Sequence, residues 1–193
     1  QVIATAIEKG IRSILLPNID ASSIASMNRL VLDYPGICFP MMGLHPTSVK
    51  KNFSDEFEIV RQELISGHYI AVGEIGIDLY WYKTMLREQS LVFEQEIDLA
   101  LALHMPVVIH ARESELRVCE ILAEYPVLAG RVVFHCFSAD VGVARRVLDL
   151  GGNLSFTGVV TFTKAETIQA AARYVPADRM MLETDAPYLS PEP

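Results

Sequence analysis

Short apolar runs recur along the chain, and amphipathic stretches with helical spacing separate them. The runs are nearly continuous rather than alternating, which is typical of parallel strands covered on both faces. Strands are predicted over residues 11–16, 37–43, 70–74, 106–110, 131–135, 152–156 and 179–183. Helices are predicted over residues 22–33, 54–66, 84–104, 113–124, 139–150 and 164–174, and over 1–9 as the tail of a helix that Gly10 ends.

This alternation of strand and helix predicts an α/β protein with a parallel sheet, either doubly wound or closed into a barrel. The chain contains neither a G-x-G-x-x-G turn nor a G-x-x-x-x-G-K-[ST] loop. Their absence removes the usual phosphate-binding interpretations of a doubly wound sheet. No linker or low-complexity tract interrupts the pattern, and 193 residues fit one domain. We therefore predict a single domain over residues 1–193.

Four residues of metal-ligand type follow four different predicted strands. They are Glu74 and His110 at the ends of the third and fourth strands, His135 at the end of the fifth, and Asp185 just after the last. Each alone has an ordinary explanation, such as a hydrogen-bonded structural histidine or a carboxylate that caps a turn. In a barrel of parallel strands, however, these ends converge on one mouth, where catalysis occurs. The combination predicts one shared site.

Two histidines and two carboxylates suit Zn²⁺, Mn²⁺, Fe²⁺ or Co²⁺, and oxygen-rich ligand sets also accept Mg²⁺. Carboxylates can bridge two ions about 3.5–4 Å apart, which lower the pKa of a bound water and hold both oxygens of a displacement reaction. Two aromatic residues, Tyr80 and Trp81, follow Glu74 closely. Either they pack against the fold, or they line the mouth and stack on a base or a sugar.

Composition narrows the class of protein. The hydrophobic fraction of 51% and the mean hydropathy of +0.28 predict a large core and exclude disorder. No apolar run approaches the roughly 18 residues of a membrane span, and no secretory signal is recognisable. Three widely spaced cysteines in apolar runs predict reduced core thiols of a cytoplasmic protein. A net charge of −8 argues against coating of nucleic acid by bulk electrostatics, but not against a local pocket for one strand end.

Six motifs resemble those of the TatD family of metal-dependent deoxyribonucleases, which are amidohydrolase-like TIM barrels. They are GLHP, VGEIGIDLYW, MPVVIHARES, VFHCFS, LSFTGVVTF and LETDAPYLSP, and they occur in the family's order through the whole chain. The resemblance implies a (β/α)8 TIM barrel with two divalent metal ions, Mg²⁺, Mn²⁺ or Zn²⁺. It implies that Glu74 bridges the ions, that His110 and His135 bind one of them, and that Asp185 binds the other and acts as catalytic acid and base.

The resemblance also implies a substrate. His45 and Arg112 look like residues near the substrate phosphate, and Glu183 looks like a supporting acidic residue. The implied activity is 3′-to-5′ exonuclease cleavage of DNA, either single-stranded or at an end, without a membrane partner. Protein partners are not predicted.

One feature departs from the family, whose first strand carries a His-x-His pair that ligates the ion shared by Asp185. No His-x-His occurs in these 193 residues. A full barrel domain has about 250 residues, so we expect this chain to lack the first strand and the C-terminal segment of the barrel. A molecule without that strand would have an open seam with unpaired edges and would lose two ligands at one metal site.

Two other functions stay open on the residues alone. Amidohydrolase-like barrels also cleave lactones, amides and aminoacyl-tRNA, and the fold does not choose among these substrates. A catalytically silent barrel that acts as a binding protein is the remaining alternative.

Overall fold

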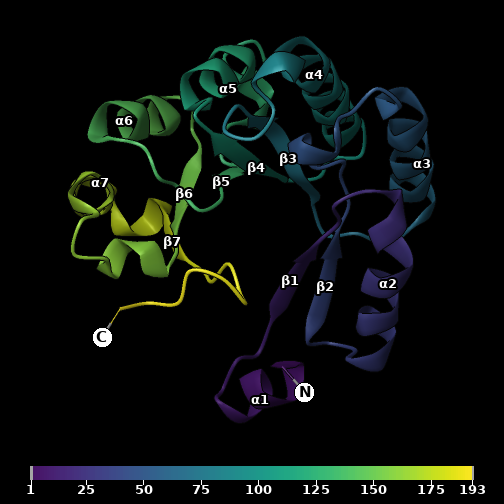
Figure 1. Ribbon diagram of the computed structural model, residues 1–193, viewed down its shortest axis with the longest axis horizontal. Helices are drawn as coiled ribbons and strands as arrows, with labels where there is room; N and C mark the ends of the chain where they lie inside the picture. The colour runs from purple at the N-terminus through teal and green to yellow at the C-terminus, as the bar shows by residue number, and fades with distance from the viewer. Residues whose placement is uncertain (1, 193) are drawn as a thin grey trace.

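The computed structural model describes residues 2–192, in which parallel strands alternate with helices (Figure 1). The strands are β1 (Ile14–Pro17), β2 (Cys38–Met41), β3 (Val72–Asp78), β4 (Val107–Arg112), β5 (Val132–Phe134), β6 (Asn153–Phe156) and β7 (Met180–Leu182). The helices are α1 (Val2–Glu8), α2 (Ile24–Asp33), α3 (Phe53–Ser66), α4 (Leu86–Ala102), α5 (Glu115–Leu122), α6 (Val141–Asp149) and α7 (Glu166–Tyr174). The predicted alternation is therefore confirmed.

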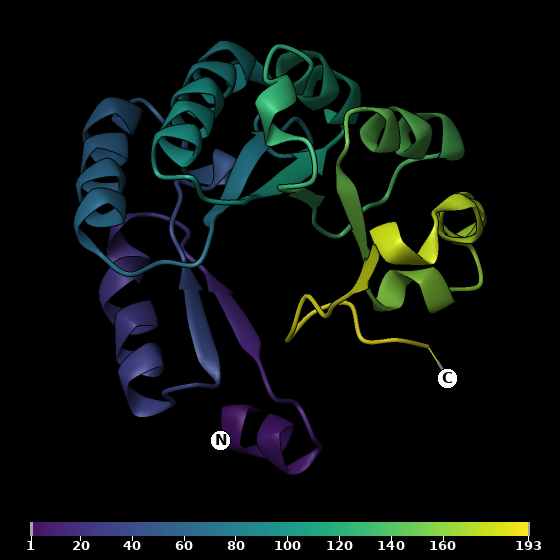
Figure 2. The ribbon, with the colours of Figure 1, turned by 180° about the vertical axis from the view of Figure 1, so that it is seen from behind.

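The strands follow one another in sequence order around the molecule. β1 pairs with β2, and β3 to β7 form a second sheet, in which every pairing is parallel. A bridge between Met42 and Val72 joins the two sheets, and the Gly73 N–H donates to the Met42 carbonyl at 3.0 Å. Among the described residues β1 and β7 each have one strand neighbour, and the ring is open between them in both views (Figures 1 and 2). This arrangement is that of a TIM-barrel-like fold, as the sequence predicts.

The helices cover the outside of the strands, and α4 shows how the sequence specifies this packing. Phe93 and Ile97 lie four residues apart on α4, and both are fully buried. Residues at this spacing share one helix face, so the apolar face of α4 packs on β3, while Arg87 and Asp98 of the same helix are exposed. The continuous apolar runs of the strands supply the other half of this core, with Ile75, Ile77 and Ile109 completely buried.

β3 is longer than predicted, and this changes the position of Glu74. The sequence predicts a strand that ends at Glu74, but β3 continues to Asp78, so Glu74 lies inside the strand. The strand continues because Gly76 has φ +138° and pairs with His110, where a Cβ would overlap the His110 carbonyl oxygen. Glycine inside a strand permits close approach of another backbone, and here Gly76 permits close approach of β4. The prediction that β4 ends at His110 is wrong for the same reason, because pairing continues to Arg112.

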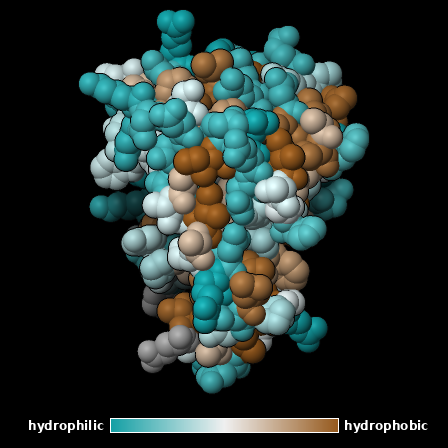
Figure 3. Space-filling view, turned by 90° about the vertical axis from the view of Figure 1, so that its right-hand side faces the viewer, coloured by the Kyte–Doolittle hydropathy of each residue, from teal (hydrophilic) through white to brown (hydrophobic). Residues whose placement is uncertain are grey.

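The outer surface is largely polar. On the side formed by α2 and α3, hydrophilic side chains are interspersed with apolar ones (Figure 3). The apolar side chains on these helices include Leu32, Ile59 and Ile65. Among residues 2–192, every helix is too short or too polar to cross a bilayer.

A carboxyl group lies in the core between α4 and the segment after β2. Glu96 on α4 has 1% of its surface exposed. Its Oε1 accepts the Leu44 N–H at 2.6 Å, while its Oε2 has no partner among the described residues. Burial raises the pKa of Glu96 well above its usual value, so the group is a neutral carboxylic acid. It holds the backbone immediately before His45.

We expect Gly76→Ala to destabilise the protein more than Gly130→Ala. Both glycines have positive φ, which costs an L-residue about 1–2 kcal/mol, but a Cβ at Gly130 would meet no atom within 4 Å. At Gly76 the added methyl also forces β3 away from β4, which adds about 1–3 kcal/mol. Urea unfolding of the two variants measures the difference. Equal losses would show that only the backbone angle matters.

We expect Glu96→Gln to change how stability depends on pH. The unfolded Glu96 titrates near pH 4.5 and the folded group at a higher pH, so the wild-type protein loses stability as pH rises between the two values. The glutamine variant lacks this titration. As pH rises between these two values, the free energy of unfolding of the variant should therefore increase relative to that of the wild type, by up to about 1.4 kcal/mol per pH unit. Denaturant unfolding from pH 4 upward measures the gain, and a difference that is constant with pH would contradict it.

Candidate metal centre and active site

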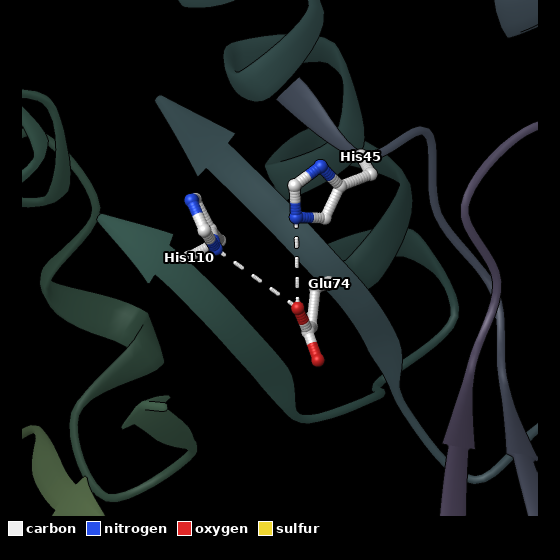
Figure 4. Close-up of side chains that lie close together, drawn as sticks. All are labelled: His45, Glu74 and His110. Carbon is white, nitrogen blue, oxygen red and sulfur yellow. Dashed lines mark ion pairs between the residues drawn. The ribbon is translucent and has the colours of Figure 1, made fainter. Parts of the chain in front are cut away.

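Glu74 lies at the centre of a group of three imidazole rings. Its Oε2 is 3.4 Å from His135 Nε2, 3.7 Å from His45 Nε2 and 4.0 Å from His110 Nδ1. The rings of His45 and His110 both turn toward this carboxylate (Figure 4). Glu74 comes from β3 and His110 from β4, while His135 directly follows β5 and His45 lies beyond β2. The structure thus brings these four sequence-predicted residues together.

His110 is oriented by a second carboxylate that the sequence interpretation missed. His110 Nε2 lies 3.0 Å from Asp78 Oδ2, and the Asp78 side chain is 1% exposed. Burial alone would raise the pKa of Asp78, but hydrogen bonds from His110 and the Trp81 N–H outweigh it and leave this pKa lowered. An ionised carboxylate only accepts hydrogen bonds, so it places the proton of a neutral His110 on Nε2. The lone pair of Nδ1 then faces Glu74.

Glu183 orients the His135 ring, as Asp78 orients that of His110. His135 Nδ1 lies 3.4 Å from each Glu183 oxygen, which leaves Nε2 facing Glu74. Burial disfavours the charged ring, but the hydrogen bond to Glu183 and the charges of Glu74, Glu183 and Asp185 raise the pKa of His135 to about 9. Burial likewise opposes ionisation of Glu183, but His135 lowers the pKa of Glu183 below its usual value. A divalent ion ligated by Nε2 would replace the proton that this imidazole otherwise carries.

His45 has the opposite arrangement of donor and acceptor. Its Nδ1 accepts the Thr47 N–H at 3.2 Å and lies 2.7 Å from Thr47 Oγ1. Burial and the neighbouring His110 lower the pKa of His45 to about 3, so the ring is neutral. Because Nδ1 is an acceptor, the hydrogen of the neutral ring is on Nε2, which faces Glu74. His45 therefore presents a hydrogen-bond donor to the site.

The electrostatics of the site fit a divalent cation. The Glu74 side chain is 13% exposed, and its burial raises its pKa, partly offset by His135 and His110. Two further carboxylates, Asp185 and Glu183, raise the pKa of Glu74 as well. Ligand atoms of His45, Glu74 and His110 all lie within 4.8 Å of one another, so this group could hold an ion. A cation would compensate the clustered negative charge that the imidazoles compensate only in part.

The remaining two predicted residues lie at the edge of this group. Asp185 follows β7 and is half-buried, and no hydrogen bond or ion pair of its carboxylate is found within residues 2–192. Its charge nevertheless reaches Glu74 and His135, whose pKa values it raises. Arg112 ends β4 and is exposed, and its guanidinium lies over the Tyr80 ring rather than against Glu74.

Asp78 could have been found from the sequence if β3 had been extended. Side chains at i, i+2 and i+4 of a strand point to the same face, so Asp78 belongs on the face of Glu74. The predicted strand ends at Glu74, so the sequence interpretation does not place Asp78 on the same strand face. No comparable sequence pattern identifies Thr47 as the partner of His45 Nδ1, because this contact depends on the local turn after His45.

The two remaining histidines, His68 and His104, are exposed. Cys38 and Cys119 are buried thiols, as the sequence predicts. Cys136 differs from the predicted core thiol, because it is half-buried with φ +47° and its N–H donates to Glu183. Burial raises the pKa of the Cys136 thiol to about 11, so it stays protonated near neutral pH.

Comparison with known proteins decides the family. The sequence profile described as "TatD related DNase" matches residues 1–193, which is the whole chain. The chain belongs to the TatD-related DNase family.

Relatives in this family are metal-dependent hydrolases. "Uncharacterized metal-dependent hydrolase YcfH" of Escherichia coli (strain K12) is 35% identical over 193 residues, which cover 100% of this chain and 71% of the relative. "3'-5' ssDNA/RNA exonuclease TatD" of Pantoea vagans (strain C9-1) is 30% identical, with 99% of this chain and 74% of that protein covered. This TatD-family chain is accordingly a metal-dependent hydrolytic enzyme.

Solved structures agree on the fold. The crystal structure of the TatD homologue YJJV from Escherichia coli K12 superposes with a TM-score of 0.90 at 26% identity. The superposition covers 98% of this chain and 73% of that one. A TatD family hydrolase from Entamoeba histolytica gives a TM-score of 0.82 at 21% identity, covering 97% of this chain and 65% of that one, and supports the fold alone.

We expect Asp78→Asn to move the proton of His110. The amide oxygen can still accept the Trp81 N–H, which lies 2.8 Å from Asp78 Oδ1, but the amide NH₂ then faces His110 Nε2. His110 must accept there, so its proton moves to Nδ1 and the lone pair no longer faces Glu74. Imidazole ¹⁵N chemical shifts of the metal-free protein report the tautomer, with His45 as the internal reference. An unchanged His110 pattern would contradict this orientation.

Proposed function

We propose that this enzyme hydrolyses phosphodiester bonds of DNA in the 3′-to-5′ direction, with two divalent ions held around Glu74. One observation carries the proposal: Glu74 Oε2 lies among the imidazoles of His45, His110 and His135, at 3.4 to 4.0 Å. The names of two relatives, from Pantoea vagans and Yersinia pseudotuberculosis, support a single-stranded nucleic acid as substrate.

In this proposal Glu74 would hold both ions, His110 and His135 would hold one of them, and Asp185 would hold the other. The hydrogen bonds behind the rings support this choice, because Asp78 and Glu183 each face the far nitrogen of a ring and leave the nitrogen near Glu74 for an ion. At His135 the ion would take the place of a proton. The bound ions, Mg²⁺, Mn²⁺ or Zn²⁺, would supply a water of lowered pKa and positive charge for the phosphate oxygens.

His45 and Arg112 bind the substrate phosphate. The His45 Nε2–H points toward Glu74 and donates to a phosphate oxygen that lies against the centre. The pKa of His45 is lowered to about 3, so the ring is neutral, and its one hydrogen is on Nε2 because Nδ1 accepts from Thr47. Arg112 contributes the edge of its planar guanidinium, which can donate two parallel hydrogen bonds to one phosphate.

Asp185 handles the proton of the reaction. As general base it accepts a proton from the attacking water, and as general acid it returns the proton to the leaving 3′ oxygen. It fits this role because its carboxylate has no hydrogen-bond or ion-pair partner within residues 2–192 yet interacts electrostatically with Glu74. Glu183 supports the reaction indirectly by holding the His135 ring through Nδ1.

We expect the full-length protein to release nucleotides from the 3′ end of 5′-labelled single-stranded DNA with Mg²⁺ or Mn²⁺, and to stop when EDTA is added. Asp185→Asn should lower kcat by about 10²- to 10⁴-fold, the usual contribution of a general base. Glu74→Ala should abolish metal-dependent turnover. Asp149→Asn, which neutralises an exposed carboxylate on α6, serves as the control and should keep full activity.

The same assay separates the other substrates. Rates are measured side by side on DNA, a lactone and an aminoacyl-tRNA. Undiminished nuclease activity in Glu74→Ala, or a higher kcat/KM on the lactone or the aminoacyl-tRNA, would overturn the proposal.

A further inference from the structure

Two large aromatic side chains lie exposed next to the metal centre, in the segment between β3 and α4. Tyr80 is 45% exposed and Trp81 is 64% exposed. Their ring centroids are 4.7 Å apart, and the rings are nearly perpendicular at 89°. A large part of each residue's surface therefore remains in contact with water. Their position calls for an explanation beyond the packing of the core.

The aromatic pair holds an arginine. The guanidinium carbon of Arg112 lies 3.9 Å from the centroid of Tyr80 and 5.9 Å from that of Trp81. Both distances are within the range of cation–π attraction. No ion pair between this guanidinium and a carboxylate is found among the described residues, so its N–H groups remain available for an anion. A guanidinium stacked on one face can still donate along its edge to a phosphate.

The segment is tied to the metal centre by direct hydrogen bonds. Asp78 Oδ1 accepts the Trp81 N–H at 2.8 Å, while the other oxygen of the same carboxylate lies 3.0 Å from His110 Nε2. The Leu79 N–H donates to the Arg112 carbonyl at 2.9 Å. The position of Trp81 is therefore coupled to that of His110 through one side chain.

We propose that Tyr80, Trp81 and Arg112 form a stacking subsite for an unpaired nucleobase next to the reacting phosphate. This inference rests on the proposed nuclease function and names the part of the substrate that binds at the rim. The aromatic rings contact the face of the base, while Arg112 holds the phosphate attached to the same nucleotide. A base inside a duplex has both faces covered by its neighbours, so the subsite favours single strands, and it tolerates any base because every base has a π-face.

The test compares substrates with and without a base. We expect Trp81→Ala and Tyr80→Ala to lower kcat/KM on a single-stranded oligothymidylate by about 5- to 150-fold, mainly through KM. Trp81→Ala should act normally on an oligonucleotide with abasic 3′-terminal residues and on bis(p-nitrophenyl) phosphate, which has no base. Tyr80→Ala also removes the ring under Arg112, so it should lose activity on these two substrates as well. Tyr80→Phe keeps the ring and should retain activity on all three. Equal losses of Trp81→Ala on all three substrates, or no loss on any, would overturn the subsite.

A matched control exists elsewhere on the surface. The Arg145 guanidinium lies 5.7 Å from the centroid of Tyr174, which ends α7 and is 40% exposed. Tyr174→Ala removes a similar exposed arginine–tyrosine contact that is not connected to Glu74. Its kcat/KM on the oligothymidylate should equal that of the wild type.

Fluorescence separates the subsite from the proposed function. Trp81 is the single tryptophan of the 193 residues, so quenching by oligothymidylate reports stacking without any catalysis. We expect quenching by the oligothymidylate and little by its abasic counterpart, with the signal lost in Trp81→Phe. A wild-type protein that is quenched but hydrolyses neither DNA nor the small diester would refute the nuclease function and leave the subsite standing. Equal quenching by both oligonucleotides would refute the subsite.

Discussion

The largely buried carboxylate of Glu74 is the constraint to which the rest of the site responds. A charge in this position is costly unless other groups compensate it, and burial does raise the pKa of Glu74. Three imidazoles surround it, but two more carboxylates add negative charge nearby. A divalent cation would compensate this clustered negative charge. The electrostatics around Glu74 thus fit the metal dependence for which relatives of the family are named.

The second layer of hydrogen bonds decides what each ring can do. Asp78 and Glu183 each accept from the far side of a histidine, so the near nitrogen of His110 faces Glu74 with its lone pair, and that of His135 can do so once an ion replaces its proton. Thr47 donates to His45 instead, so that ring presents a hydrogen. Three histidines around one carboxylate thus divide into two of ligand type and one of donor type. The division depends on partners behind the rings rather than on the rings themselves.

Asp78 also connects the centre to the rim. One of its oxygens faces His110 and the other accepts the Trp81 N–H, so His110 and the aromatic segment share one supporting side chain. The length of β3 makes this possible. Gly76 allows β3 to lie close to the backbone of β4, and the pairing of the two strands therefore continues to Asp78. The close approach at Gly76 therefore positions the Asp78 carboxylate, which contacts both the candidate metal centre and the candidate base-stacking subsite.

The sequence by itself determined the alternation of strands and helices and the set of polar residues near the strand ends. Local periodicity and continuous apolar runs such as that of β4 carry this information without any tertiary partner. The choice of a TIM barrel over a doubly wound sheet came from the six motifs that resemble the TatD family. Only the tertiary structure decided where β3 ends, that Asp78 supports His110, and which nitrogen of each histidine faces Glu74. Those outcomes depend on atoms far apart in the chain: 32 residues separate Asp78 from His110, and 48 separate His135 from Glu183. Hydrogen-bond partners at such distances are chosen by the packing of neighbouring strands, and no local pattern encodes them.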